Sequence, residues 1–459
     1  MQTFDFVIIG AGPAGEGAAH KARELGASVA IVDRRWFGGS CPHIGCVPSK
    51  ALLHAAERHW SGSDYSWQRA SERRDYMVNR PADAAEPDDR SHVASLEQAG
   101  ASTFRGAGRI TAPGRVSVTA DDGAITELAA QDVIVAVGST SKVPPIDGLA
   151  ETNPWTNEQA TLTRELPKSL LVLGGGPTGC ELAQVFVRFG VPTTIVQSGP
   201  RLVPTEHPRN AETVRFALER DGAVVLTGSR ATRVRAGAGT DGAHVVDLGD
   251  GASAEGHVIL LAVGRDFPVG DLGMEHYGIA VSGPNAYPRD GRLRIADGLW
   301  VAGDPAGPEL HTHQGHYQGE LAVRMAQGEA IVPDYRALPR ATYMDPESAS
   351  VGVTLDQAIE RGLDAFECVA DFTKSAKGYS VEAETGHVTI VIDRATRELV
   401  GAAMACPDAS AAIHECVLAI KAHVPVDTLA ETIHAFPSTS RILNGLFAEA
   451  RATLATPAA

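Results

Sequence analysis

The sequence FDFVIIGAGPAG at residues 4–15 decides the fold of the first part of the chain. Residues 4–9 are mainly apolar and predict a short buried strand, and the glycines after them predict a tight turn. An alanine-rich helix is expected from Glu16 to about Leu25, followed by a second strand over residues 28–32 that ends at Asp33. This order of elements predicts a βαβ unit built around a Gly-x-Gly-x-x-Gly turn.

Such a turn is typical of dinucleotide-binding proteins. Its glycines let the backbone approach a pyrophosphate at the helix N-terminus, and an acid at the end of the second strand bonds a ribose hydroxyl. A glycine-rich turn without a ligand is the alternative, but the strand, the helix and the acid all stand where binding requires them. The predicted contacts are Gly10, Gly12, Pro13, Ala14, Gly15 and Asp33.

The same pattern returns later in the chain. A strand is expected over residues 169–173, a helix over 180–189 and a second strand over 193–196. The turn between the first strand and the helix supplies the predicted contacts Gly174, Gly176, Pro177, Thr178 and Gly179. Two such units predict two dinucleotides in one chain, and therefore electron transfer between them.

The second unit lacks the ribose-binding acid. Gln197 stands where Asp33 stands in the first unit, and Ser198 and Arg201 follow it. An acid would repel a 2′-phosphate, whereas an arginine can accept one, so the sequence favours NADPH over NADH. The alternative is that Arg201 is a solvated loop residue.

A cysteine pair follows the first unit, in the sequence GGSCPHIGCVPSK at residues 38–50. If a helix begins near Cys41, Cys46 lies a little over one turn further along, so the two sulfurs can meet. The helix N-terminus then stabilises a thiolate, which suits a disulfide that opens and closes. A buried structural pair and half of a metal site are the alternatives, although zinc pairs usually have tighter spacing and a second pair elsewhere.

Composition narrows the class of protein. A chain of 459 residues predicts roughly three domains, and its net charge of −16 makes nucleic acid or an anionic membrane surface a poor partner. No apolar run is long enough to span a membrane, and the first residues lead straight into a strand without the basic region of a signal peptide. Six cysteines are too few for a disulfide scaffold, so we expect a cytoplasmic protein.

Three further stretches complete the predicted organisation. Strands over 132–139 and 257–264 run into small-residue turns, and Pro144-Pro145 marks a domain junction between them. The strand over 299–304 ends in Gly303-Asp304, where an acid could bond a ribityl chain, and a helix follows residues 311–313. A separate α+β domain is expected from residue 336, with strands at 350–353, 388–392 and 399–405 and helices at about 408–422 and 438–451.

These motifs together resemble the flavoprotein disulfide reductases, the family of lipoamide dehydrogenase, glutathione reductase and mercuric reductase. The resemblance spans nearly the whole chain and implies an α/β fold with two Rossmann-like domains and an α+β dimerisation domain. The implied boundaries are 1–146 for the FAD domain, 147–264 for the NAD(P) domain, 265–335 for a central domain that completes the FAD site, and 336–459 for the interface domain. A homodimer is implied, with each active site completed by the partner's C-terminal domain.

The resemblance also implies residue roles. Cys46 would contact the flavin as the charge-transfer thiolate, Cys41 would meet the substrate, and Lys50 would lie by the flavin N5, paired with Glu181. The remaining implied flavin contacts are Gly39, Ser40, Ala107, Gly138, Ser139, Gly303, Asp304 and His311, and Gly264 is implied for the nucleotide. NAD(P)H would reduce FAD, which would reduce the Cys41–Cys46 disulfide and through it a small-molecule substrate, with no resident metal.

The C-terminal region departs from the family pattern. Disulfide reductases of this family carry His-Pro-Thr-x-Ser-Glu there, in which the histidine is the acid–base group. This chain has Phe436 in place of that histidine and Arg441 in place of the glutamate, and an apolar ring cannot move a proton. His434 lies two positions earlier, where a structural role is favoured over a replacement for the base.

The departure leaves the substrate open. The 2-ketopropyl coenzyme M oxidoreductase/carboxylase is similar at two points, with phenylalanine in the histidine's place and a motif that begins Ser-Cys-Pro-His, as here at residues 40–43. The favoured interpretation is an FAD enzyme that passes electrons through its dithiol to an unusual thiol, disulfide, thioether or metal substrate. A quinone reductase of the diaphorase type and a lipoamide dehydrogenase-like subunit of a multienzyme complex are the alternatives.

Overall fold

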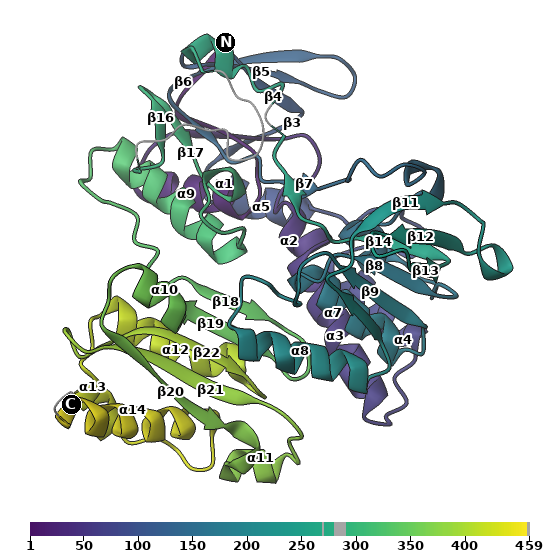
Figure 1. Cartoon of the computed structure of the whole chain (residues 1–459). Helices are drawn as coiled ribbons and strands as arrows, with labels where there is room; N and C mark the ends of the chain where they lie inside the picture. The colour runs from purple at the N-terminus through teal and green to yellow at the C-terminus, as the bar shows by residue number, and fades with distance from the viewer. Residues whose placement is uncertain (269, 280–290, 457–459) are drawn as a thin grey trace. The chain divides into compact units, whose positions relative to one another are not determined.

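The computed structural model describes residues 1–268, 270–279 and 291–456. The chain forms two compact units, which are described separately. Unit 1 contains Met1–Ala51, Gln68–Lys142 and Gly264–Pro333, and unit 2 contains Leu52–Trp67, Val143–Val263 and Asp334–Ala459. The chain thus leaves unit 1 just before Pro144-Pro145 and returns to it at Gly264 (Figure 1).

Unit 1 is built on an eight-stranded sheet whose central strands are parallel and buried. Its main path runs β16-β17-β6-β1-β2-β3, and a hairpin of β4 and β5 joins the sheet through β6. The predicted βαβ start is confirmed, with β1 pairing in parallel with β2 and with β6. The strands are β1 (Gln2–Ile9), β2 (Val29–Asp33), β3 (Ser102–Arg105), β4 (Ala107–Ala112), β5 (Arg115–Thr119), β6 (Ile125–Val135), β16 (Arg294–Ala296) and β17 (Leu299–Val301).

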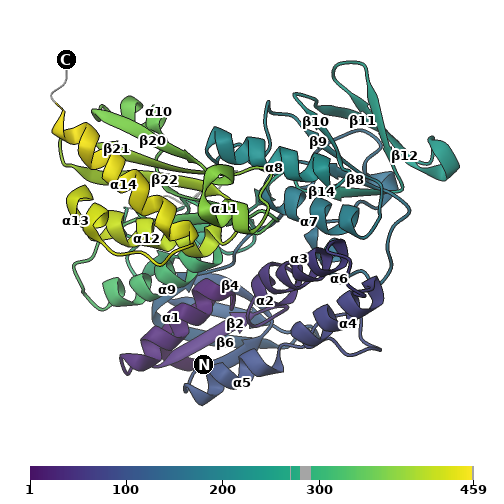
Figure 2. The same cartoon turned by 90° about the horizontal axis from the view of Figure 1, so that it is seen from below.

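Two helices of unit 1 pack closely enough to exclude side chains between them. Helices α1 (Pro13–Glu24) and α9 (Thr312–Ala326) lie side by side in both ribbon views (Figures 1 and 2). A Cβ on Gly319 would come within 2.1 Å of the Ala14 carbonyl oxygen, so this crossing requires glycine. The close approach fixes the N-termini of both helices relative to the sheet. The other helices of unit 1 are α2 (Ser40–His43), the start of α3 (Cys46–Trp60), most of α4 (Trp67–Met77) and α5 (Arg90–Gln98).

The first part of unit 2 repeats the βαβ architecture. Its four strands are all parallel, in the order β10-β9-β8-β14, and a three-stranded antiparallel sheet of β11, β12 and β13 accompanies them. The elements are α6 (Asn157–Leu162), β8 (Leu170–Leu173), α7 (Pro177–Arg188), β9 (Thr193–Gln197), α8 (Pro208–Arg220), β10 (Val224–Thr227), β11 (Ala231–Arg235), β12 (His244–Leu248), β13 (Ser253–Gly256) and β14 (Val258–Leu261).

The second part of unit 2 is the expected α+β region. Its five antiparallel strands run in the order β18-β19-β22-β21-β20. The strands predicted at 350–353, 388–392 and 399–405 fall on β19, β21 and β22, and the two predicted helices fall on α12 and α14. The elements are β18 (Pro339–Thr342), β19 (Ser348–Gly352), α10 (Leu355–Glu360), β20 (Ala365–Asp371), α11 (Ala376–Ser380), β21 (His387–Asp393), β22 (Glu398–Ala405), α12 (Ala409–Lys421), α13 (Val426–Glu431) and α14 (Thr439–Ala455).

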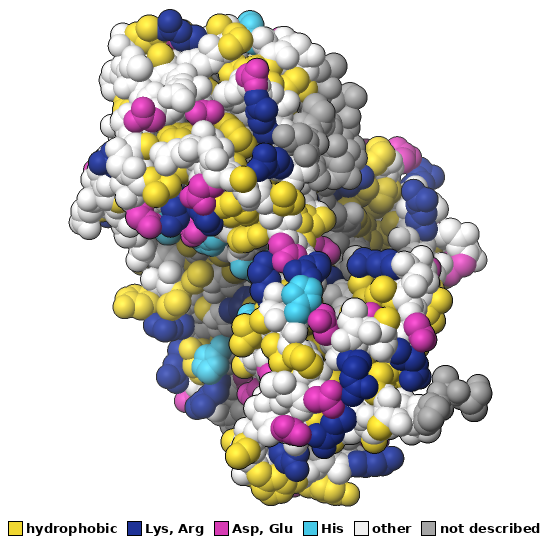
Figure 3. Space-filling view, turned by 90° about the vertical axis from the view of Figure 1, so that its left-hand side faces the viewer, with side chains coloured by type: hydrophobic (Ala, Val, Ile, Leu, Met, Phe, Trp, Pro, Cys, Tyr) yellow, Lys and Arg dark blue, Asp and Glu magenta, His cyan; other side chains and the backbone are white. Residues whose placement is uncertain are grey.

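The mixed α/β class predicted from the sequence is therefore confirmed. In the described ranges, no helix combines the length and the apolar character that crossing a membrane requires. Basic and acidic side chains are interspersed on the face drawn in Figure 3, and neither sign gathers there into one large field.

Candidate active site

The two motif cysteines lie together in unit 1, next to the start of helix α9. Neither forms a disulfide in this structure, and Cys41 is half-buried whereas Cys46 is exposed. The Cys46 Sγ lies 3.4 Å from the Thr312 Oγ1, at the first residue of α9. The two thiols and one hydroxyl therefore form a small polar cluster between two chain segments that are far apart in the sequence.

The surroundings of the two sulfurs differ. The hydrogen bond between Cys41 and Cys46, with burial as the second cause, raises the pKa of the Cys41 thiol. Cys46 is the first residue of α3, where the helix dipole stabilises a negative charge. Burial and the neighbouring sulfur therefore disfavour a thiolate on Cys41, whereas the helix start favours one on Cys46.

The structure refines the helical condition stated for this stretch. A helix does begin near Cys41, but it is the short helix α2, and Cys46 begins the separate helix α3. The two helices are separated at Ile44 and Gly45, where the backbone folds tightly enough that a Cβ on Gly45 would lie 2.9 Å from the Ser40 carbonyl oxygen. Cys46 gains a helix N-terminus of its own as a result.

Thr312 is a site residue that sequence reasoning missed. The prediction placed a helix after residues 311–313 and named His311, which caps α9 and stacks on His313 with ring centroids 5.0 Å apart. The hydroxyl that meets the sulfur, however, belongs to the residue between these histidines. The available signal was a hydroxyl at the first position of the helix that follows Gly303-Asp304.

The glycine turn of unit 1 fits the pyrophosphate of a dinucleotide. Helix α1 has no side-chain cap at Gly12, which leaves its first N–H groups for an anion. Gly39 has φ 69°, and a Cβ there would lie 2.6 Å from the Gly12 Cα, so the two backbones form one narrow cradle. Asp33 accepts the Ala11 N–H at 2.8 Å, which places its carboxylate beside this turn. Burial raises the pKa of Asp33.

A second group of predicted flavin contacts also comes together in unit 1. The Ser139 hydroxyl donates to the Asp304 carboxylate, and Arg265 donates to the Ser139 carbonyl oxygen at 2.7 Å. Arg265 also lies 3.8 Å from Asp304 as an ion pair. Sequence reasoning named Ser139 and Asp304 as contacts but gave Arg265 no role. Strands β7 (Thr140–Ser141) and β15 (Arg265–Asp266) pair antiparallel and hold these residues together.

The other predicted flavin contacts of unit 1 occupy turns and element ends. Gly138 and Gly303 have φ values of 64° and 80°, which favour glycine, and Ser40 begins α2. Ala107 begins β4. Lys50 donates to the Ser49 hydroxyl at 3.4 Å in unit 1, whereas Glu181 is buried in unit 2, where it accepts the Tyr343 N–H at 2.9 Å. The Lys50–Glu181 pair therefore remains a prediction.

The glycine turn of unit 2 has the same local design with a different acceptor. Gln197 accepts the Gly175 N–H through its Oε1 at 3.0 Å, and Pro177 is the first residue of α7. Arg201 is exposed and donates to the Pro204 carbonyl oxygen at 3.0 Å. The turn thus offers uncapped N–H groups at Gly176 without a carboxylate at Gln197. The remaining predicted contacts in this part of the chain are Gly174, Thr178, Gly179 and Ser198 in unit 2, and Gly264 in unit 1.

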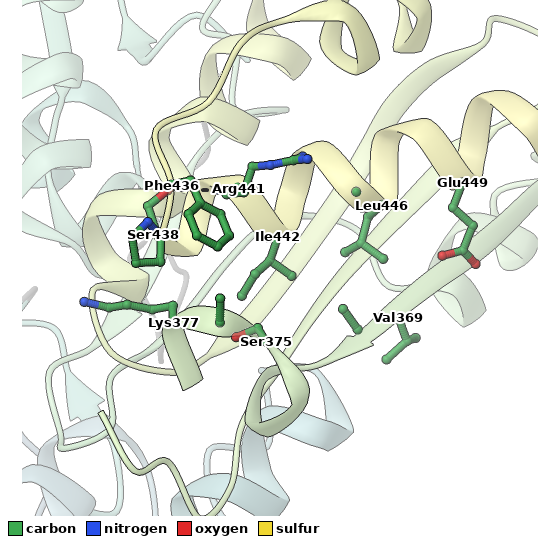
Figure 4. Close-up of a pocket in the computed structure, with 13 residues that line it drawn as sticks. Val369, Ser375, Lys377, Phe436, Ser438, Arg441, Ile442, Leu446 and Glu449 are labelled. Carbon is green, nitrogen blue, oxygen red and sulfur yellow. Dashed lines mark hydrogen bonds between the residues drawn. The ribbon is translucent and has the colours of Figure 1, made fainter. Parts of the chain in front are cut away.

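The two C-terminal replacements line one pocket in unit 2. Phe436 and Arg441 belong to a cavity of about 390 Å³ between α14, α11 and β20. Figure 4 shows the Phe436 ring and the Ile442 and Leu446 side chains facing this space, whereas the charged end of Arg441 points away from them. The Phe436 side chain is 73% exposed, so it presents an apolar ring at the surface.

His434 is held away from this pocket by its own contacts. Its Nε2 lies 2.6 Å from the Glu415 carboxylate, and its Nδ1 lies 2.9 Å from the Thr432 carbonyl oxygen. Its side chain is almost fully buried, in contrast to Phe436. These contacts support the structural role that the sequence favoured for this histidine.

Comparisons with known proteins identify the family of the chain. The family model described as pyridine nucleotide-disulphide oxidoreductase matches residues 4–326, and the model of the dimerisation domain of that family matches residues 338–445. The chain is 30% identical to dihydrolipoyl dehydrogenase of Mycobacterium leprae over 97% of this chain and 98% of the relative. It is 32% identical to dihydrolipoyl dehydrogenase of Thermus scotoductus over 96% of each chain.

Two solved structures have the same fold over nearly the whole chain. LpdA from Mycobacterium tuberculosis has a TM-score of 0.87 and 26% identity, and covers 98% of this chain and 99% of its own. The Cu(II) complex of the HOCl-induced flavoprotein disulfide reductase RclA from Escherichia coli has a TM-score of 0.84 and 25% identity, and covers 98% and 100%. With family models that match residues 4–326 and 338–445, and with relatives at least 30% identical over nearly the whole chain, the chain belongs to the pyridine nucleotide-disulphide oxidoreductase family.

Proposed function

We propose that this protein uses NAD(P)H and FAD to reduce the Cys41–Cys46 disulfide, and that the resulting dithiol reduces a small substrate without a histidine base. The observation that carries the proposal is the hydrogen-bonded pair of Cys41 and Cys46. Cys46 lies at the start of α3 and beside Thr312. FAD, when bound, supplies the hydride chemistry between the nicotinamide and the disulfide.

Specific residues would hold the flavin. Gly12 and Gly39 provide the backbone cradle for its pyrophosphate, and Asp33 provides an acceptor for its ribose. Asp304 stands at the end of the strand beside β6, where it would accept from a ribityl hydroxyl, oriented by Ser139. These residues bind and orient, while the cysteine pair exchanges electrons with the substrate.

The missing base sets the substrate class. Cys41 keeps its proton because of its hydrogen bond to Cys46, so attack on a disulfide requires that proton to leave. A phenylalanine cannot accept it. We therefore propose a substrate for which this proton passes to water or to the substrate itself and not to a histidine: a metal ion, a thioether or a strongly electrophilic disulfide.

The dimerisation domain supports a homodimer in which Phe436 faces the partner's site. Three large apolar side chains of this region, Tyr379, Ile433 and Phe436, are each at least 73% exposed, as expected for a surface that a second copy covers. Phe436 would then place an apolar ring where relatives place a base. The few cysteines of the chain favour the cytoplasm as its compartment.

The second nucleotide is proposed to be NADPH. Gln197 supplies a neutral acceptor, so no carboxylate repels a 2′-phosphate at this turn. Arg201 is exposed on the loop after β9, within reach of a phosphate that binds there.

An anaerobic titration tests the proposal. We expect NADPH to produce a long-wavelength absorbance from the Cys46 thiolate and the oxidised flavin before the flavin bleaches, and Cys41→Ser to react differently because it cannot form the disulfide. Bleaching of the flavin without this band in the unaltered protein would contradict the dithiol route and favour direct reduction of quinones.

A second candidate substrate is copper(II). The structural relative RclA has been solved as a Cu(II) complex, which favours this metal among the three substrate classes proposed above. The reduced cysteine pair would lose two electrons to form the Cys41–Cys46 disulfide and release its remaining protons to water, and two copper(II) ions would each gain one electron to become copper(I). Across the described residues no group of three His, Cys, Asp or Glu side chains is arranged to hold a metal, so the cysteine pair would have to bind it.

Lipoamide remains the alternative that most of the named relatives favour, since they are dihydrolipoyl dehydrogenases. The two substrates are separated by measuring turnover with copper(II) and turnover with dihydrolipoamide, each at the same NADPH or NAD concentration. Rapid oxidation of dihydrolipoamide would overturn the argument from Phe436.

A further inference from the structure

A buried histidine that the proposed function does not use lies two residues after Cys41. His43 is the last residue of α2, and only 1% of it is exposed. Its Nε2 lies 2.9 Å from the Phe37 carbonyl oxygen. A carbonyl oxygen only accepts, so this nitrogen carries the proton and donates. The Nδ1 is buried and has no hydrogen-bond partner among the described residues.

The bond from His43 closes a loop that carries Cys41. Gly38 and Gly39 lie inside this loop with φ values of 91° and 69°, so their backbone adopts a conformation that other residues rarely hold. The Gly38 N–H donates to the Ala11 carbonyl oxygen at 2.8 Å, which ties the loop to the glycine turn of β1. Without the ring, the loop would have no side-chain link between Phe37 and α2 in the described structure.

The far end of that link is itself fixed. The Phe37 N–H donates to the Asp89 carboxylate at 2.8 Å, and the Arg105 guanidinium pairs with the same carboxylate at 2.6 Å. The Arg105 guanidinium also lies over the Phe37 ring, 4.7 Å from its centroid. The Phe37 carbonyl is therefore a fixed anchor, and the His43 ring transmits its position to α2.

Burial disfavours a positive charge on the ring. The His92 ring on α5 lies 5.3 Å from that of His43, and its Nδ1 pairs with the Glu16 carboxylate of α1 at 2.8 Å. This hydrogen bond raises the pKa of His92. Burial is the largest cause and lowers the pKa of His43, and His92 lowers it further, whereas the hydrogen bond to the Phe37 carbonyl, Asp89 and Glu16 act in the opposite direction.

We infer that His43 is a positioning residue for the Cys41–Cys46 couple: by donating to the Phe37 carbonyl, its ring holds α2 so that the Cys41 sulfur stays within hydrogen-bond reach of Cys46. The inference rests on the proposed function only in that the couple is redox-active. His43 does not exchange protons with the substrate. Its role is to maintain the hydrogen bond between the two sulfurs that stabilises the Cys46 thiolate.

The test compares two substitutions at His43. Phenylalanine in His43→Phe fills the site without a donor, whereas glutamine in His43→Gln keeps an N–H that can reach the carbonyl. His92→Gln is the matched control, because it removes the Glu16 contact and leaves the His43–Phe37 bond in place. If His43→Phe does not fold, His43→Asn replaces it, since asparagine is too short to reach Phe37.

The readout is the pH dependence of iodoacetamide alkylation of the cysteine pair in the dithiothreitol-reduced, flavin-loaded protein. For His43→Phe we expect the midpoint to rise by about one pH unit. A shift of this size corresponds to the loss of one hydrogen bond that stabilises the thiolate. His43→Gln and His92→Gln should stay close to the unaltered protein. An unchanged midpoint in His43→Phe, or equal shifts in His43→Phe and His43→Gln, would overturn the inference.

This readout is independent of turnover. If the unaltered protein gave no long-wavelength band with NADPH, the proposed function would fail. The alkylation midpoints would still decide whether His43 positions the pair. Flavin content, measured by visible absorbance, is compared in all variants, and the midpoints are taken on flavin-loaded protein only, because Gly39 of the cradle lies inside the loop that the His43 bond closes.

Discussion

The two glycine turns share a backbone and differ in one side chain. Gly10 and Gly174 have φ values of 104° and 107°, and a Cβ on either would lie within 2.3 Å of a carbonyl oxygen, that of Ala136 or of Ala262. At the strand end, Asp33 in the first turn and Gln197 in the second accept the N–H that follows the first glycine, at 2.8 and 3.0 Å. The same fold of the chain therefore presents a carboxylate in one unit and an amide in the other.

This difference shows which part of a dinucleotide site the backbone determines. The turn and the start of the helix depend on glycines that cannot carry a Cβ, and such glycines stand at the same places in both units: Gly10 and Gly15 in the first, Gly174 and Gly179 in the second. The choice between ribose and phosphorylated ribose depends on one side chain that the backbone tolerates in either form. Only unit 1 adds a cysteine pair, so only there does the dinucleotide turn adjoin a group that can store electrons.

The largest effects should come from adding a side chain to a glycine in either turn. A Cβ on Gly15 would lie 1.9 Å from the Gly10 carbonyl oxygen, and one on Gly179 would lie 2.1 Å from that of Gly174. Overpacking of this kind costs ~1–3 kcal/mol or more, so each alanine variant should weaken its own nucleotide by about 10- to 100-fold. Gly15→Ala should purify with little flavin.

Gly179→Ala should weaken the binding of the nicotinamide nucleotide and leave the flavin in place. It should purify yellow, resist reduction by NADPH and still be reduced by dithionite. Equal loss of flavin from both variants, measured by absorbance after gel filtration, would contradict the assignment of one dinucleotide to each turn.

A smaller effect should follow from making the second turn resemble the first. Gln197→Asp keeps an acceptor near the Gly175 N–H and adds a negative charge where a 2′-phosphate would lie. We expect the ratio of kcat/KM for NADPH to that for NADH to fall by about tenfold or more, which corresponds to a change near 1.4 kcal/mol. Arg201→Gln should lower the same ratio without improving NADH, and a ratio that rises in Gln197→Asp would exclude the proposed NADPH preference.

A further prediction concerns the cysteine pair, which adjoins the glycine turn of unit 1 and has no counterpart at the turn of unit 2. Thr312→Val removes the hydroxyl 3.4 Å from the Cys46 Sγ while keeping the shape of the side chain. A hydrogen bond to a charged group contributes ~1.5–3 kcal/mol, so the alkylation midpoint of the pair should rise by about one to two pH units. Thr312→Ser is the control that keeps the hydroxyl, and a midpoint that is the same in both variants would remove Thr312 from the site.

The smallest effect concerns a buried histidine of unit 2. His387 bonds Asn210 through Nε2 at 2.8 Å, and burial, with His207 and Arg209, lowers its pKa to about 3 against a smaller opposing effect of Glu367. The unfolded chain binds this proton near pH 6.5, so the stabilisation is complete above that pH and is lost as the pH falls toward 3. Between pH 7 and pH 5.5 the loss should be about 1.3 kcal/mol, or ~1–2 °C in Tm for a chain of this length.

His387→Gln keeps partners for Asn210 and cannot be protonated. Its Tm should be lower than that of the unaltered protein at pH 7 but should fall less steeply on acidification. A slope equal to that of the unaltered protein, in scanning calorimetry of both at matched ionic strength, would show that another group controls the acid sensitivity.

Sequence reasoning reached the parts of the molecule that depend on local pattern. The glycines of both turns, Asp33, Gln197 and the cysteine spacing are each set by neighbours along the chain, so the βαβ units and the close cysteine pair could be predicted. The break between α2 and α3 could not, because it depends on how Gly45 packs against Ser40. Thr312 and Arg265 were missed for a different reason. Their partners, Cys46 and Ser139, are more than 120 positions away in the sequence.

The central claim is that Cys41 and Cys46 store a pair of electrons that the flavin alone would not hold. The most direct measurement is an anaerobic reductive titration with dithionite, counted per bound flavin, in the unaltered protein and in Cys41→Ser. The account predicts that the unaltered protein takes up twice as many electrons as the variant before its flavin is fully bleached. Equal uptake by the two proteins would contradict it, and would leave the flavin as the direct donor to the substrate.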